Sequence, residues 1–227
     1  MGDENPVEII QSLTDWLLSE ARLLDDTSAL DQAIVDKING AGIPLSRYTT
    51  GVPSLHPQVN SFSTLWEKGK GLSFREYRQD PDLPMPRNSP IFVAYDTGRS
   101  QRFHLEEIDL EGEYELLREF RKNGLTDYIV LALPFSDGSF KAMSFATDRP
   151  GGFSPSDLEI LYGLRLPLAT TIEVRYLRHL ANLLMETYVG HVAGRRVLNG
   201  EIKRGSGENI QAVIWFCDLK GFTNLSE

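Results

Sequence analysis

The apolar residues near the N-terminus of the chain recur with the period of a helix. They are spaced three, four or seven positions apart, at Ile9, Ile10, Leu13, Trp16, Leu17, Leu23 and Leu24. Asn5 and Pro6 precede them as a helix cap and a first helical residue. The pattern predicts a helix from Pro6 to about residue 25 whose apolar stripe packs on its own domain or against another subunit.

A second helix and a group of short strands follow. Thr27 or Ser28 caps a helix that ends at Asn39-Gly40. Runs of β-forming residues then predict strands at about Leu45–Val52, Val59–Lys68 and Leu72–Gln79. The glycines of Gly69-Lys70-Gly71 lack the spacing of a phosphate-binding loop and predict a hairpin turn.

The middle of the chain alternates between turn signals and β-forming runs. Residues 80–90 hold four prolines and predict an exposed loop. Ile91–Asp96 fits a strand or a short helix, whereas Ser100–Glu106 alternates like a strand. The remaining elements predicted here are a helix over Tyr114–Lys122 and a hairpin formed by Asp127–Phe135, a Ser136–Gly138 turn and Ser139–Thr147.

The last long periodic segment predicts a closing helix. Ser154 and Pro155 supply its start signals, and a helix from Pro155 to about Val189 would span roughly 50 Å. Pro167 removes one backbone hydrogen bond, so we expect a kink near residues 163–167. Two apolar sets share this helix: Leu164, Leu168 and Ile172, then Leu177, Leu180, Leu184 and Tyr188. Their spacing fits a short parallel coiled coil or a core helix.

Composition narrows the classes of partner and compartment. The formal net charge is −9 with a sequence pI near 5.0, so neither nucleic acid nor an anionic membrane is expected as a partner. No apolar stretch approaches the roughly 18 residues of a membrane span. The single cysteine, Cys217, excludes an internal disulfide framework and suits a cytoplasmic protein.

The order of these elements resembles a GAF sensor domain over about residues 28–175. Two helices, an antiparallel sheet with inserted helices, a last hairpin and the phrase Phe153-Ser154-x-x-Asp157-Leu158 carry the resemblance. It implies an α+β fold, a GAF-like antiparallel sheet flanked by helices with a long C-terminal signalling helix. A PAS-like sheet is the alternative. Residues 1–27 would then form a separate N-terminal helix.

A second resemblance lies near the end of the chain. Five apolar residues, Val213–Cys217, predict a buried strand, and the run Phe216-x-Asp218-Leu219-x-Gly221-Phe222-Thr223 resembles the opening strand of class III nucleotidyl cyclases, with six of eight positions matching. The resemblance implies that Asp218 and the Leu219 carbonyl bind Mg²⁺ or Mn²⁺. It also implies that the backbone of Gly221, Phe222 and Thr223 contacts the nucleotide phosphates, as small residues allow.

These two resemblances together imply a regulatory function. Residues 176–209 would be a signalling helix and cyclase transducer segment, and residues 210–227 the truncated start of a catalytic domain. The family's other catalytic residues lie downstream, so this fragment is expected to be inactive and to bind no metal, while its parent makes cAMP or cGMP. A parallel homodimer is the expected assembly. The alternatives are a small-molecule-binding module and a purely structural dimeriser.

A ligand site in the sensor domain has weaker signals. His56, His104, His179 and His191 share no metal-ligand spacing. If a pocket exists, aromatic faces and one positive charge would suit a planar anionic ligand. The residues predicted to line it are Trp66, Arg102, Tyr128 and Phe145. The identity of the sensor ligand cannot be read from the sequence.

Overall fold

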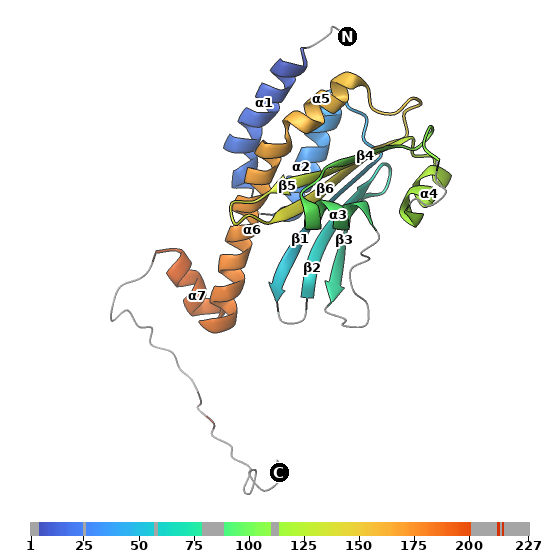
Figure 1. Ribbon diagram of the computed structural model, residues 1–227. Helices are drawn as coiled ribbons and strands as arrows, with labels where there is room; N and C mark the ends of the chain where they lie inside the picture. Colours follow the sequence, from blue (N-terminus) through green and yellow to red (C-terminus); the bar gives the residue numbers. More distant parts are fainter. Residues whose placement is uncertain are drawn as a thin grey trace, which may run out of the picture. The chain divides into compact units, whose positions relative to one another are not determined.

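A computed structural model describes residues 5–24, 26–56, 59–78, 89–109 and 114–200, with Val213 and Trp215. The chain forms two compact units, Met1–Leu184 and Met185–Glu227. The first unit contains a sheet with helices on both faces (Figure 1).

The N-terminal helices begin where short polar side chains satisfy free backbone N–H groups. Helix α1 spans Pro6–Ser19, a 3-10 turn spans Ala21–Leu23, and helix α2 spans Thr27–Gly40. Asn5 Oδ1 accepts a hydrogen bond from the Val7 N–H at 3.1 Å, which confirms the predicted cap of α1. The cap of α2 is Asp26, whose Oδ1 accepts from the Ser28 N–H, because Thr27 is already helical.

The stripe of α1 packs mainly on its own unit. Leu13 and Leu17 are buried in the core, and Trp16 packs against it in part. Leu23 alone among the stripe's large side chains is 62% exposed. Of the two interpretations that the sequence left open, packing within the domain therefore accounts for most of the stripe.

Six antiparallel strands form one sheet in the order β3-β2-β1-β6-β5-β4. Their bounds are Arg47–His56 (β1), Val59–Glu67 (β2), Gly71–Arg78 (β3), Gln101–His104 (β4), Asp127–Pro134 (β5) and Phe140–Thr147 (β6). All six lie within a few residues of the predicted runs, and the turn at residues 68–70 joins β2 to β3 as a hairpin.

Two short helices lie between the strands in sequence. Helix α3 spans Pro90–Thr97 and helix α4 spans Glu115–Lys122. The segment Ile91–Asp96, which the sequence left open between strand and helix, is thus part of helix α3. Ser89 explains this choice, because its Oγ accepts a hydrogen bond from the Phe92 N–H at 3.1 Å while Pro90 occupies the first helical position.

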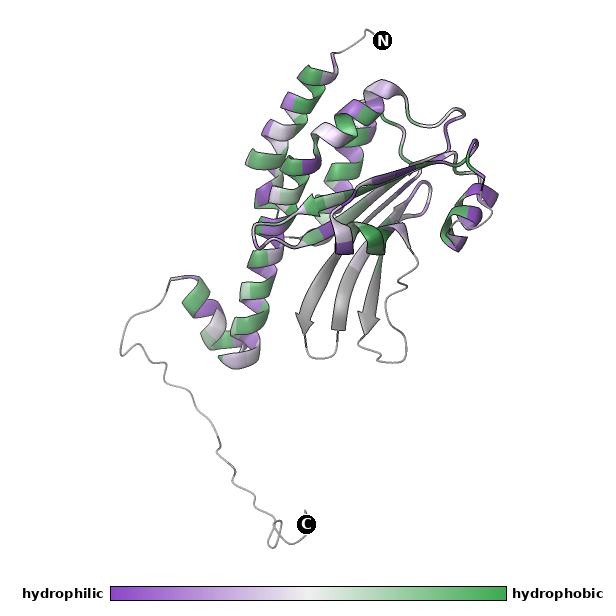
Figure 2. Ribbon diagram, in the orientation of Figure 1, coloured by the Kyte–Doolittle hydropathy of each residue, from purple (hydrophilic) through white to green (hydrophobic). Residues whose placement is uncertain are grey.

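The two faces of the sheet support different hydrophobic clusters. The first face, which carries Tyr48 and Phe145, packs against α1, α2, α5 and α6. The second face, which carries Tyr128 and Ala146, packs against α3 and α4. Figure 2 shows hydrophobic and hydrophilic residues alternating along the helices next to the sheet. The alternation of side chains along each strand makes this two-sided core possible.

The predicted closing helix consists of two helices. Helix α5 spans Pro155–Gly163 and helix α6 spans Arg165–Tyr188, with a break at Leu164. Pro167 has no N–H for the Gly163 carbonyl, so the helical ladder is interrupted where the kink was predicted. Beyond the break, Leu164, Leu168 and Ile172 are buried in the first-face core.

The second unit contains helix α7, His191–Leu198. Gly190 precedes the helix and Gly200 follows it. A Cβ on Gly194 would lie 2.8 Å from the Met185 carbonyl oxygen, so glycine is required for that close approach.

Candidate functional site

The second face of the sheet has a floor of small and hydroxyl-bearing side chains around β1. Thr49 and Ser144 face each other across the β1–β6 pair, with their hydroxyl oxygens 2.5 Å apart. Gly51 and Ala142 form the next pair on the same face of these strands. Small residues leave room above a sheet, and their hydroxyls can bind polar ligand groups.

Helix α3 approaches this floor through one tyrosine. The Tyr95 hydroxyl donates a hydrogen bond to the Gly51 carbonyl oxygen at 2.8 Å. A Cβ on Gly51 would lie 3.0 Å from the same hydroxyl, so a larger residue there would push Tyr95 aside. Burial raises the pKa of Tyr95, which keeps the hydroxyl protonated as a donor. Gly51 therefore sets how closely α3 lies over β1.

Arg47 supplies the positive charge of the second face. Its guanidinium carbon lies 4.9 Å from the centre of the Phe120 ring in α4, and Nη1 lies 3.9 Å from Oε1 of Glu67. The side chain is 19% exposed. A cation between an aromatic ring and a carboxylate is held in place, yet Arg47 still reaches the surface.

The β4–β5 end of the second face is filled by aromatic side chains. Tyr128 lies against Phe103 and Phe120, with ring centres 6.3 Å and 5.0 Å apart. Burial raises the pKa of Tyr128 to about 12, with Ser144 hydrogen bonding opposing the shift. A ligand on this face would therefore lie toward β1 and β2, near Arg47 and Thr49.

The four residues predicted to line a sensor pocket do not share one site. Cross-strand pairing places Trp66, Phe145 and Arg102 on the first face, in one row across the sheet, and Tyr128 on the second. The hairpin itself carried a signal for this separation. A turn centred on Asp137 pairs Tyr128 with Ala146, so neighbouring Phe145 must point to the opposite face.

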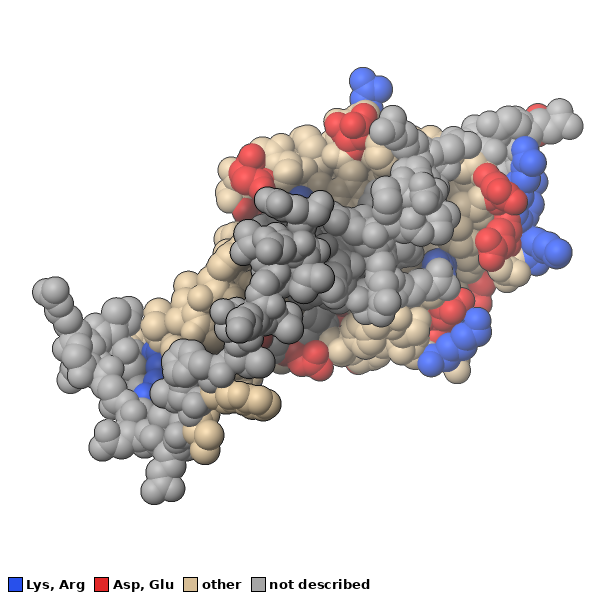
Figure 3. All heavy atoms as spheres, turned by 90° about the horizontal axis from the view of Figure 1, so that it is seen from below, with Lys and Arg blue, Asp and Glu red and all other residues tan. Residues whose placement is uncertain are grey.

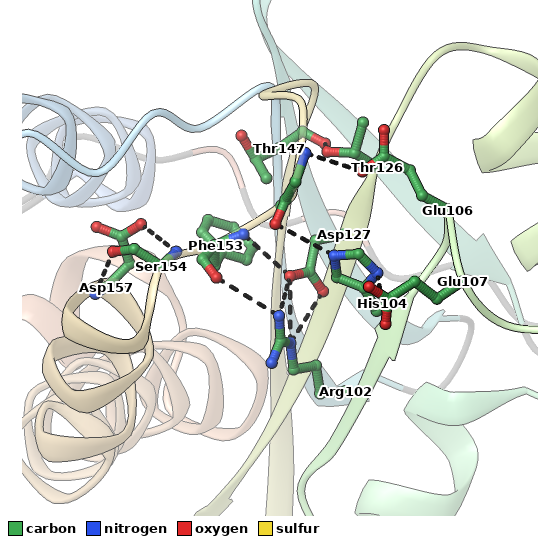
Figure 4. A network of polar contacts seen from close by, with 12 residues as sticks. Arg102, His104, Glu106, Glu107, Thr126, Asp127, Thr147, Phe153, Ser154 and Asp157 are labelled. Carbon is green, nitrogen blue, oxygen red and sulfur yellow. Dashed lines mark hydrogen bonds and ion pairs between the residues drawn. The ribbon is translucent and has the colours of Figure 1, made fainter.

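Arg102 has a structural partner rather than a ligand to bind. Its guanidinium donates to both carboxylate oxygens of Asp127 (Figure 4). Nη2 lies 2.7 Å from Oδ2, and Nε lies 3.1 Å from Oδ2 and 3.2 Å from Oδ1. Asp127 is fully buried, whereas 31% of the Arg102 side chain is exposed. The Phe153 N–H also donates to Asp127 Oδ2 at 3.0 Å. The pair thus joins β4 and β5 to the loop before α5.

The same loop is fixed at the start of α5. Ser154 and Asp157 form a reciprocal capping box, and Arg149 pairs with the Asp157 carboxylate. A Cβ on Gly152, at φ +71°, would lie 2.5 Å from Asp127 Oδ2. Glycine is therefore needed for the loop to approach the buried carboxylate.

Comparisons with known proteins concern the fold of this chain. No protein-family model and no curated protein matches it. The phycocyanobilin-bound GAF domain of a cyanobacterial phytochrome matches with a TM-score of 0.50 at 12% identity, over 78% of this chain and 99% of that one. The chain has a GAF-like fold. The first unit is therefore a GAF-like domain, and the PAS-like alternative is not needed.

Two further solved structures are GAF domains with similar statistics. One belongs to a two-component sensor histidine kinase from Bacillus halodurans, with a TM-score of 0.49, 15% identity and coverage of 69% of this chain and 99% of that one. The other is a putative GAF sensor protein from Burkholderia vietnamiensis. It matches with a TM-score of 0.48 at 12% identity, over 78% of this chain and 99% of that one.

A buried carboxylate lies under α2 on the first face of the GAF-like domain. Asp31 is fully buried, and its Oδ1 accepts a hydrogen bond from the Tyr48 hydroxyl at 2.6 Å. No hydrogen-bond partner of Asp31 Oδ2 was found in the described part of the chain. Burial raises the pKa of Asp31 to about 6, although Tyr48, Thr64 and Arg175 oppose the shift. No sequence pattern had singled out this residue.

The described surface carries charges of both signs. Lys68 pairs with Asp148 and Lys70 with Glu67, and Figure 3 shows acidic and basic side chains side by side on the face that it displays. Among the described residues no group of His, Cys, Asp and Glu could hold a metal. None of the described helices is long and apolar enough to cross a membrane.

The predicted cyclase residues lie outside the described part of the chain. They are Asp218, Leu219, Gly221, Phe222 and Thr223. Their roles in metal and phosphate binding stay predictions from the sequence.

Proposed function

We propose that this chain is the regulatory region of a cytoplasmic class III nucleotidyl cyclase, which makes cAMP or cGMP from ATP or GTP. One observation carries the proposal: a GAF-like domain and a six-of-eight match to the cyclase metal motif, around Asp218, occur in one chain. The domain's last helix, α6, runs in sequence toward that motif. This order suits a sensor placed before the enzyme it controls.

The regulator of this sensor is a small molecule bound on the second face near β1. This region offers a cation from Arg47 and hydrogen-bonding hydroxyls from Thr49 and Ser144. It also offers the aromatic surface of Tyr95. They suit an organic ligand with a polar or anionic group. A thioether-linked bilin does not fit, because the single cysteine, Cys217, lies outside the GAF-like domain.

Two copies of the chain pair in parallel through α6. Its positions 166, 170, 173, 177, 180 and 184 follow the alternating spacing of four and three residues that a coiled-coil seam requires. Leu166, Leu177 and Leu184 on this stripe are 60%, 50% and 37% exposed. Class III active sites form between two catalytic domains, so the pairing of the helices would set how those domains meet.

Replacing Asp218 by alanine tests the enzymatic half of the proposal. In the protein that carries this chain with a complete catalytic domain, Asp218→Ala is expected to abolish cAMP or cGMP formation, because a metal ligand is lost. Removing Mg²⁺ and Mn²⁺ with a chelator should have the same effect. Product formation is measured by chromatography with ATP and with GTP.

The control for this experiment is Asp96→Ala, the same chemical change at an exposed position of α3. It should leave activity unchanged. Circular dichroism should show the same helix and strand content for both variants. Metal-dependent activity retained by Asp218→Ala would refute the cyclase assignment.

Native mass spectrometry of residues 1–227 tests the sensor and the pairing. A dimer with added mass is the expected result, and the added mass identifies the ligand class to assay. Thr49→Val removes one hydroxyl from the floor at nearly constant volume and should weaken ligand retention. A bare monomer would contradict both the sensor ligand and the homodimer.

A further inference from the structure

One position in the α6 stripe is charged. Glu173 lies between Thr170 and Leu177 in the seam spacing, where an apolar residue would strengthen pairing. In a parallel pair each seam residue faces its own copy. Two carboxylates would then approach each other across the seam, and like charges in close contact weaken association. The stripe is therefore interrupted at its middle.

The β5–β6 turn holds this carboxylate. Glu173 Oε1 accepts hydrogen bonds from the Ser136 N–H, at 2.9 Å, and from the Ser136 hydroxyl. Next to this contact, the Phe135 and Tyr176 rings lie 6.1 Å apart, and Lys141 Nζ lies 5.3 Å from the Phe135 ring centre. Burial lowers the pKa of Lys141, and the negative charges of Asp137 and Glu173 oppose that shift. The turn thus draws the Glu173 carboxylate toward its own chain.

We propose that Ser136 and Glu173 form a latch through which the β5–β6 turn sets the strength of α6 pairing between two copies of the chain. The latch rests on the proposed self-association. While Ser136 binds Glu173, the carboxylate is drawn toward its own chain and the leucines on either side can meet their copies. When the turn moves away, the carboxylates face each other and pairing weakens.

The strands that carry the turn link the latch to the second face. β5 and β6 carry Tyr128 and Ser144 on that face, while the turn between them contacts α6. A ligand that shifts these strands would shift Ser136 relative to Glu173. The latch therefore gives the sheet a direct route to the helix, without a change in the core under α2.

A double-mutant cycle on the whole chain tests the latch. The dissociation constant of the dimer is measured by analytical ultracentrifugation for the wild type, Ser136→Ala, Glu173→Gln and the double variant. Ser136→Ala should weaken the dimer about threefold at low salt, because Glu173 loses the hydroxyl bond and keeps only the N–H bond of residue 136, so that its carboxylate is held less firmly away from its copy. Glu173→Gln, which is uncharged, should pair at least as tightly as the wild type, and adding Ser136→Ala to it should change nothing further.

Ser139→Ala is the matched control, because it removes a hydroxyl from the same turn that bonds Lys141 and not Glu173. It should leave the dissociation constant unchanged. Equal effects of Ser136→Ala and Ser139→Ala, or an effect of Ser136→Ala that persists in Glu173→Gln, would overturn the latch alone. A chain that stays monomeric in every variant, Glu173→Leu included, would overturn the latch together with the proposed pairing.

Discussion

Replacing Arg102 by methionine is expected to lower the free energy of unfolding of the GAF-like domain by about 3–5 kcal/mol, because it leaves a buried carboxylate without its partner. Asp127 is fully buried, and both of its carboxylate oxygens accept hydrogen bonds from the guanidinium of Arg102. Methionine keeps the apolar stem of arginine but offers no charge. The Phe153 N–H would remain as a single neutral donor to Asp127. Urea unfolding followed by circular dichroism measures the loss.

A second substitution separates the charge effect from lost packing. Adding Asp127→Asn to Arg102→Met removes the stranded charge, so the double variant should be more stable than Arg102→Met alone. Arg102→Lys should lie between the wild type and Arg102→Met, since lysine keeps the charge and loses the two-pronged geometry. If Arg102→Met costs under about 1 kcal/mol, as an exposed ion pair would, the pair does not hold β4, β5 and the loop before α5 together.

The stability of the GAF-like domain is expected to carry a pH-dependent contribution from Asp31. Burial raises its pKa in the folded state to about 6, above the 3.8 of a freely exposed aspartate. The folded state therefore binds the proton more tightly than the unfolded state does. The resulting stabilisation of the fold is fully present below about pH 3.8 and is lost as the pH rises through about 6. The full loss is about 3 kcal/mol. Charged groups that act on Asp31 are Arg175, which lowers its pKa, and Asp26, which raises it.

Asp31→Asn isolates this contribution from the other titrating groups. Asparagine keeps an oxygen that can accept the Tyr48 hydrogen bond and carries no charge. The free energy of unfolding of Asp31→Asn should nearly equal that of the wild type at pH 4. It should exceed the wild-type value by about 3 kcal/mol above pH 6.5. Asp36→Asn, at an exposed position of the same helix, is the control. Parallel stability curves for wild type and Asp31→Asn between pH 4 and 7 would contradict the argument.

The sequence predicted those features of the fold that depend on neighbouring residues. Asn5 and Ser154 cap their helices because a short polar side chain reaches the N–H groups two or three residues on. Pro167 breaks the closing helix near the predicted point because the missing N–H is a property of one residue. The strands and the hairpin around Asp137 follow from alternation and turn signals. Asp26 was missed as a cap because three adjacent residues could all serve.

The pocket prediction failed where it needed the sheet as a whole. Tyr128 and Phe145 look equivalent as aromatic residues in β-runs, yet the register of one hairpin places them on opposite faces. Arg102 looks like a free cation, and only the pairing of β4 with β5 brings it to Asp127. The contact between Arg102 and Asp127 joins residues 25 positions apart, and spacing along the chain carries no information about it. The turn centred on Asp137, in contrast, already implied that Tyr128 and Phe145 point to opposite faces.

Local patterns in this sequence predicted the order of the elements and the type of most of them, with Ile91–Asp96 left open between strand and helix. The resemblances carried by short motifs led to the α+β class and to the proposed cyclase metal site at Asp218. The contacts between distant side chains became visible in the folded chain alone: Asp31 with Tyr48, Arg102 with Asp127, and Ser136 with Glu173. The physical reason is that burial and electrostatic partners depend on strand order and helix placement. The free energies at stake in those contacts are therefore set by the assembled sheet and its two helix layers.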